Sequence, residues 1–131
     1  MSVPHIFVEY SSNVARYHDV EGLLDIVHRS AQADGLAPAD GVRSRAVERS
    51  SYRIADSADD YAFIAITARI GPGRSTEDKQ RFLASILDAA EHHVEGESGP
   101  LAIAWSAEVQ EIDADLRINK NHVRTRIQDA L

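Results

Sequence analysis

The fold is decided by the stretch YAFIAITARI, residues Tyr61–Ile70, because this is the strongest strand signal in the chain. Branched and aromatic side chains fill it, and Gly71-Pro72-Gly73 follows at once, a combination that ends a strand. Ser75 then stands where a helix N-cap is expected, ahead of an apolar stripe at helical spacing that reaches Gly96. A further apolar run, Leu101–Val109, predicts another strand. This half of the chain is therefore expected to form a strand–helix–strand unit.

The amino-terminal half repeats this order. A buried strand is predicted over His5–Tyr10, with Pro4 immediately before it. A helix follows, with Asp19 as its N-cap and Gly35 at the position where glycine commonly ends helices. Val42–Val47 then predicts a second strand. Two such units side by side predict an α/β (α+β) fold, in which a four-stranded mixed sheet carries both helices on one face.

We expect a single domain over residues 1–131, with internal repeats at about 4–55 and 60–112. A short amphipathic helix, beginning near Asn121, is expected to close the chain.

A sheet with helices on one side leaves its other face open. That face is expected to carry Phe63, Ile103 and Trp105, or their alternating neighbours. Because a monomer should not expose such an apolar surface, association into an oligomer is expected.

Composition argues against several classes of function. The 131 residues include 21 acidic and 14 basic side chains, and the net charge of −7 is unfavourable for binding nucleic acid or an anionic membrane. The chain has no cysteine, and the adjacent His92 and His93 cannot share a helix face, so no metal site is expected. No apolar run is long enough to span a membrane and no signal-peptide pattern is present, so the cytoplasm is the expected location.

Pro4 is the residue that points to chemistry. A free amino-terminal proline is a secondary amine, and burial or a neighbouring cation brings the pKa of such an amine towards neutrality, where a general base works best. Here Met1, Ser2 and Val3 precede Pro4, and a proline nitrogen within an amide has no basicity. Either Val3 marks an alternative start of translation that frees Pro4, which we favour, or the extension is genuine and the chemistry is lost.

Five short segments carry a specific resemblance, and they are Pro4–Ser11, Gly41–Arg45, Asp60–Phe63, Ile70–Ser75 and Leu116–Asn121. In order and approximate spacing they resemble the 5-carboxymethyl-2-hydroxymuconate delta-isomerases of the tautomerase superfamily. Each segment is a weak signal alone, and together they indicate the family more strongly than the substrate.

The resemblance implies a tautomerase-like isomerase that needs no metal and no organic cofactor. Its substrate would be a small polycarboxylate from aromatic degradation, like 5-carboxymethyl-2-hydroxymuconate. The family's general base is an amino-terminal proline, which matches Pro4, and two assisting arginines match Arg43 and Arg74. Guanidinium groups suit this role because they bind carboxylates in a planar, bidentate manner. The family also implies a closed homotrimer.

Simpler interpretations exist for each of these residues. Pro4 fits the start of a strand, where a missing N–H costs nothing. Arg43 and Arg45 alternate on one strand and so point the same way, as they would on a solvated edge. Arg74 follows a turn and could cap it or pair with Glu77. We favour the functional interpretation for Arg43 and Arg74, and the solvated edge for Arg45.

Two alternatives to the isomerase remain at the level of the whole protein. One is a non-catalytic trimeric binding protein of the same fold, in which Pro4 stays blocked. The other is a different proline-dependent activity, such as a decarboxylase or hydratase, because a fold does not fix a function.

Overall fold

The computed structural model describes residues 4–131. In chain order the elements are β1 His5–Ser11, α1 Val14–Tyr17, α2 Val20–Asp34, the short 3₁₀ helix η1 Ala39–Gly41, β2 Arg43–Arg49, β3 Tyr61–Ile70, α3 Thr76–Glu97, β4 Ala102–Glu111, the 3₁₀ helix η2 Ala114–Leu116 and α4 His122–Ala130.

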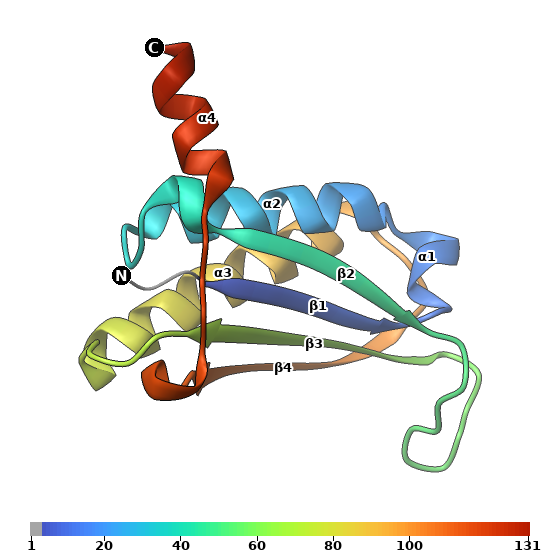
Figure 1. Cartoon of the computed structure of the whole chain (residues 1–131). Coiled ribbons are helices and arrows are strands. Elements are labelled where there is room, and N and C mark those ends of the chain that lie inside the picture. The colour runs from blue at the N-terminus through green and yellow to red at the C-terminus, as the bar shows by residue number, and fades with distance from the viewer. Residues whose placement is uncertain (1–3) are drawn as a thin grey trace.

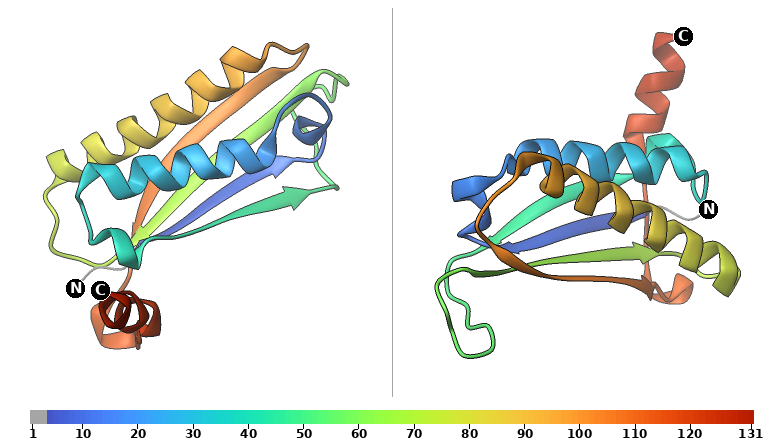
Figure 2. Two further views of the ribbon diagram at one scale, coloured as in Figure 1. Left: turned by 90° about the horizontal axis from the view of Figure 1, so that it is seen from above. Right: turned by 180° about the vertical axis from the view of Figure 1, so that it is seen from behind.

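The four long strands form a mixed sheet in the order β2-β1-β3-β4 (Figure 1). β1 and β2 are parallel, β3 and β4 are parallel, and β1 pairs with β3 in antiparallel orientation. Figure 2 shows α2 and α3 lying side by side over one face of this sheet. The predicted fold class, a four-stranded mixed sheet with both helices on one face, is confirmed.

The helices begin at the predicted caps. Asp19, Ser75 and Asn121 each accept a hydrogen bond at 3.0 Å from the backbone N–H three residues further along the chain. Gly35, which follows α2, has a φ of 81°, a left-handed conformation that glycine adopts without strain.

Two strands run slightly later than predicted. β2 covers Arg43–Arg49 rather than Val42–Val47, and β4 covers Ala102–Glu111 rather than Leu101–Val109. The short α1 was not predicted, because its four residues are too few to show a helical period.

The core lies between the sheet and the two long helices. The inward side chains of β1 and β3 are fully buried, and α2 and α3 contribute one apolar stripe each. Phe82 of α3, the largest fully buried side chain, has no solvent exposure. Burial of these apolar side chains determines which residues of each strand face the helices, and the residues between them lie on the open face of the sheet.

The prediction that Ile103 and Trp105 lie on the open face is wrong. The register pairs Ile103 with Ala62 and Trp105 with Ile64, and both β3 residues are buried beneath the helices. Ile103 and Trp105 therefore pack against the core from the edge strand. Phe63 alternates with these β3 residues and does lie on the open face, but its β4 neighbours there are small or polar. The open face is thus less apolar than predicted.

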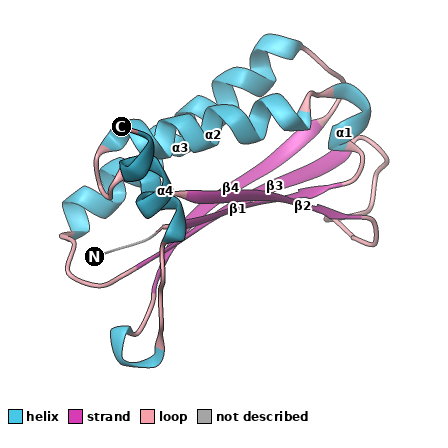
Figure 3. Cartoon of the chain, turned by 45° about the horizontal axis from the view of Figure 1, so that its top comes forward, coloured by secondary structure: helices cyan, strands magenta, loops and turns pink. Residues whose placement is uncertain are grey.

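The chain after β4, residues 112–131, forms a segment that we call the C-terminal arm. It begins beside the last residue of β3, where the N–H of Ile112 donates to the carbonyl of Ile70 at 2.7 Å. It then crosses the end of the sheet to η1, where Asn121 Nδ2 donates to the carbonyl of Asp40 at 3.2 Å. Asp40 also accepts from Nε and Nη2 of Arg124 at 3.0 to 3.1 Å. Figure 1 shows α4 projecting beyond the body of the molecule, and Figure 3 shows the loop that joins η2 to α4.

Apolar side chains of this arm are left uncovered. Leu116 is 84% exposed and Ile118 is 90% exposed, and Val123 and Ile127 of α4 are also exposed. Within residues 4–131 the exposed apolar surface that calls for a partner therefore lies on the C-terminal arm rather than on the sheet.

No helix in the described part of the chain combines the length and the apolar character needed to cross a membrane.

Candidate active site

The topology brings Pro4, Arg43 and Arg74 to the same end of the sheet. β1 and β2 begin at this end, and β3, which runs antiparallel to β1, finishes there. Pro4 comes just before β1, Arg43 is the first residue of β2, and Arg74 follows the end of β3. These are the three residues predicted from the sequence, although 39 or more positions separate Pro4 from the other two along the chain.

Pro4 is fully buried at the entrance to β1. Its carbonyl accepts a hydrogen bond from the N–H of Arg43 at 3.0 Å, which ties the start of β1 to the start of β2. The nitrogen of Pro4 is joined to Val3 in the sequence. An extension of Met1, Ser2 and Val3 across the mouth of a substrate pocket, one way in which these residues would exclude substrate, lies outside the described residues.

Arg43 lies in register with His5, so its side chain is on the open face. Its Nη2 donates to Oδ1 of Asn119 in the C-terminal arm at 3.2 Å. Because this partner is a neutral amide, the guanidinium keeps its full charge available for an anion. This hydrogen bond to Asn119 holds one end of the Arg43 guanidinium in place.

Arg74 is placed by a turn that requires glycine. Gly73, directly before it, has a φ of 103°, where a side chain would be strained. The Nε atom of Arg74 is buried and has no hydrogen-bond partner among the described residues. Arg74 forms no ion pair with Glu77 among these residues. The pKa of Asp78 is lowered mainly by hydrogen bonds from Arg81 and Ser75, and the charge of Arg74 makes a smaller contribution in the same direction. A buried donor without a partner is costly, so this atom is suited to meet an acceptor on a ligand.

Arg45 lies on the same face as Arg43, as the alternation predicted. It pairs with Phe7 rather than with His5 and so lies two residues further along the sheet from Pro4. Its Nη2 lies 2.6 Å from Nδ1 of His5, and its guanidinium stacks 4.4 Å from the centre of the Phe7 ring. These contacts give Arg45 a structural role on the open face.

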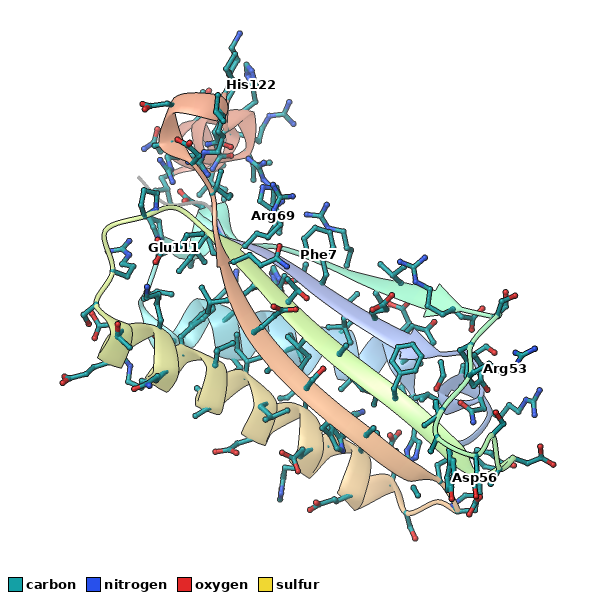
Figure 4. All side chains as sticks on the ribbon, turned by 90° about the horizontal axis from the view of Figure 1, so that it is seen from below. Phe7, Arg53, Asp56, Arg69, Glu111 and His122 are labelled. Atoms are coloured by element: carbon teal, nitrogen blue, oxygen red, sulfur yellow. The ribbon has the colours of Figure 1, made fainter. Side chains whose placement is uncertain are left out.

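Sequence reasoning missed the arginines that gather around His5. Arg43 on β2 and Arg69 on β3 are its Cα partners in the two neighbouring strands. Partial burial lowers the pKa of His5, and the charges of Arg45, Arg43, Arg69 and Arg117 lower it further, in that order. Figure 4, which looks onto the open face, shows Arg69 near the end where the C-terminal arm leaves the sheet.

Comparison with known proteins identifies the family. The sequence profile of the 5-carboxymethyl-2-hydroxymuconate isomerase family matches residues 4–127. The chain belongs to this family. Its resemblance to these isomerases in the sequence is thereby confirmed. It is similar to the 5-carboxymethyl-2-hydroxymuconate Delta-isomerase of Escherichia coli, with 31% identity over 92% of this chain and 96% of that protein.

Solved structures agree with this assignment. A 5-carboxymethyl-2-hydroxymuconate isomerase from Deinococcus radiodurans R1 has a TM-score of 0.85 at 29% identity, covering 96% of this chain and 95% of that one. A fused 4-OT protein described as a symmetric trimer has a TM-score of 0.60 at 14% identity, covering 82% of this chain and 85% of that one, and shows a shared fold only.

The side chains at this end of the sheet are suited to binding an anionic substrate, as expected for a member of the 5-carboxymethyl-2-hydroxymuconate isomerase family. The guanidinium groups of Arg43 and Arg74 are free of carboxylate partners among the described residues, and both residues lie at the end of the sheet where Pro4 precedes β1. Such an arrangement can hold an anion with several carboxylates next to the proline. Within residues 4–131 no three or more histidine, cysteine, aspartate or glutamate side chains are grouped so that they could hold a metal ion.

Proposed function

We propose that this protein isomerises an unsaturated 2-hydroxy polycarboxylate, similar to 5-carboxymethyl-2-hydroxymuconate, into its 2-oxo form. Membership of an isomerase family with the tautomerase fold supports the reaction class. The observation that carries the substrate class is the buried Nε of Arg74, a donor without a partner among the described residues, at the same end of the sheet as Pro4 in an otherwise acidic chain.

Pro4 is the general base in this proposal, once it is the amino-terminal residue. Its amine removes the proton from the 2-hydroxyl group of the dienol, and the O–H electron pair forms the 2-oxo C=O bond. The conjugated double bonds shift, and the protonated amine returns the proton to a carbon further along the chain. Atoms and electrons balance within the substrate, so the step uses no oxidant, metal or organic cofactor.

Arg43 and Arg74 bind substrate carboxylates and stabilise the charge of the dienolate that forms between the two proton transfers. Fixed donors aimed at developing charge commonly give the largest contribution to catalysis. Their positive charge also disfavours the protonated form of the Pro4 amine, which lowers its pKa towards neutrality. The burial of Pro4 acts in the same direction.

The assembly that we propose is a homotrimer. Leu116 and Ile118 of the C-terminal arm are 84% and 90% exposed, and a neighbouring subunit would cover them. One protein of this fold is described as a symmetric trimer. Light scattering should give a mass three times that of the 14.4 kDa chain, and a monodisperse monomer would refute the assembly.

A second candidate function is binding without catalysis. It is favoured by one observation, the amide that joins Pro4 to Val3 in the sequence. A protein that keeps this amide could hold a polycarboxylate between Arg43 and Arg74 without any base to move its proton.

The two functions are separated by an absorbance assay. A form of the protein that begins at Pro4 should convert a conjugated 2-hydroxymuconate-type dienol, with loss of its ultraviolet band, and EDTA should not change the rate. A Pro4 form that binds the dienol in calorimetry, but leaves the spectrum unchanged, would favour the binding protein.

A further inference from the structure

A substrate of this type carries more negative charge than the two arginines of the proposed site can neutralise. A muconate has a carboxylate at each end, and a carboxymethyl substituent adds a third. Arg43 and Arg74 provide one guanidinium for each of two carboxylates. A third carboxylate left without a partner in a partly buried site would be unfavourable, so a further cationic position should lie close to Pro4.

The structure gathers cationic side chains at one place beside that site. Arg69 lies opposite His5 on β3, just as Arg43 lies opposite His5 on β2, so the three residues form one row across the open face. Arg117 lies in the C-terminal arm two residues before Asn119, which accepts the hydrogen bond from Arg43. Its charge acts on His5 together with those of Arg43, Arg45 and Arg69.

This row is electrostatically unfavourable as it stands. Arg43 and Arg69 lie on the two strands beside β1, with His5 between them, so their like charges repel one another across β1. Neither Arg43 nor Arg69 forms an ion pair with a carboxylate among the described residues. The acidic residue of this face on β1, Glu9, is instead held by Arg49 at 2.6 Å.

Space for a ligand group adjoins the row. A cavity of about 270 Å³ on the open face is lined in part by Phe7, Thr67 and Arg69. Figure 4 shows Phe7 and Arg69 on the same side of the sheet, towards the end from which the arm leaves. A carboxylate there can accept hydrogen bonds from Arg69 while the rest of the ligand extends towards Pro4.

We propose that Arg69 and Arg117, beside His5, form a second anion subsite that binds the third carboxylate of a tricarboxylate substrate. The inference rests on the proposed function, since it assigns a specificity to the same site. Arg69 and Arg117 select the tricarboxylate by its substituent, whereas Arg43 and Arg74 act on any substrate with the muconate frame.

The test compares two substrates across matched variants. Arg69→Gln, Arg117→Gln and the double variant are assayed with the tricarboxylate and with the dicarboxylate in which a methyl group replaces the carboxymethyl group. Arg53→Gln is the control, because it removes the same charge at the opposite end of the sheet (Figure 4), where Arg53 donates to the carbonyl of its neighbour Tyr52. The form that begins at Pro4 is used throughout.

Each subsite variant should lower kcat/KM for the tricarboxylate about tenfold or more, mainly through KM, and should leave the dicarboxylate within about twofold. The control should change neither substrate. Equal losses on both substrates, or no loss on either, would overturn the subsite.

A binding measurement separates this inference from the proposed function. Propane-1,2,3-tricarboxylate should bind more tightly than glutarate, and the preference should vanish in the double variant. In an NMR titration the bound tricarboxylate should raise the pKa of His5, because its charge offsets the arginines. If neither dienol is turned over but this preference is present, the proposed function fails and the subsite stands. If the two acids bind equally well, the subsite fails whatever the activity.

Discussion

Replacing Arg43 or Arg74 by alanine tests the anion-binding part of the site. Arg43 uses one N–H on the neutral Asn119, and the buried Nε of Arg74 has no partner within residues 4–131, so both keep donors for the substrate. Loss of a hydrogen bond to an ionised group costs about 1.5–3 kcal/mol. Because a tenfold rate change corresponds to about 1.4 kcal/mol, each variant should lose roughly one to two orders of magnitude in kcat/KM.

The assay is the decay of dienol absorbance by the form that begins at Pro4, with circular dichroism to confirm folding. Arg45→Ala is the matched control, since Arg45 shares the strand and the face but contacts His5 and Phe7 instead. It should lose much less activity than Arg43→Ala. An Arg45 variant as impaired as the Arg43 variant would show that the assignment of Arg43, and not Arg45, to the site is wrong.

Three further predictions concern stability and the arm. Phe82→Ala should lower the free energy of unfolding by about 3–5 kcal/mol in a denaturant titration, because Phe82 is completely buried in the core. Asp40→Asn should speed proteolysis within residues 112–131, because Asp40 holds Arg124 at 3.0 to 3.1 Å at the base of α4, and an unchanged cleavage rate would exclude this anchor. The pKa of His5 is lowered in the folded state, so the unfolded chain takes up a proton first as the pH falls below 6.5. The stability that neutral His5 provides is complete above that pH and declines as the pH falls below it, and Arg45→Ala should reduce this decline in unfolding measurements.

Local signals in the sequence predicted most of the fold. Asp19, Ser75 and Asn121 were identifiable as caps because each has a side-chain oxygen ahead of an apolar stripe at helical spacing. The four-stranded mixed sheet followed from the repeat, and the resemblance grouped Pro4, Arg43 and Arg74 as one site. The register supports one part of that grouping, since it pairs Arg43 with His5, the residue after Pro4.

What the sequence could not give depends on contacts between distant residues. β3 has apolar side chains on both faces, so the local sequence does not show on which face of the sheet Trp105 of β4 lies. The pairing of Trp105 with the buried Ile64 places it on the face that the helices cover. The arm has no periodic pattern ahead of α4. Its path across the sheet end is set by Asn119 and Asn121, which bond residues 76 and 81 positions away. The row around His5 was missed for the same reason, because it exists only through strand register.

The central claim, that the amine of Pro4 is the base, is tested most directly by one pH–rate comparison. The form that begins at Pro4 and the form that keeps Met1, Ser2 and Val3 are assayed on the same dienol across the neutral range. The account predicts turnover only by the first form, with a rate that rises through the pKa of a near-neutral amine, because an amide nitrogen has no basicity to restore. Equal turnover by both forms would contradict it, and the base would then have to be a side chain such as His5 or Glu9.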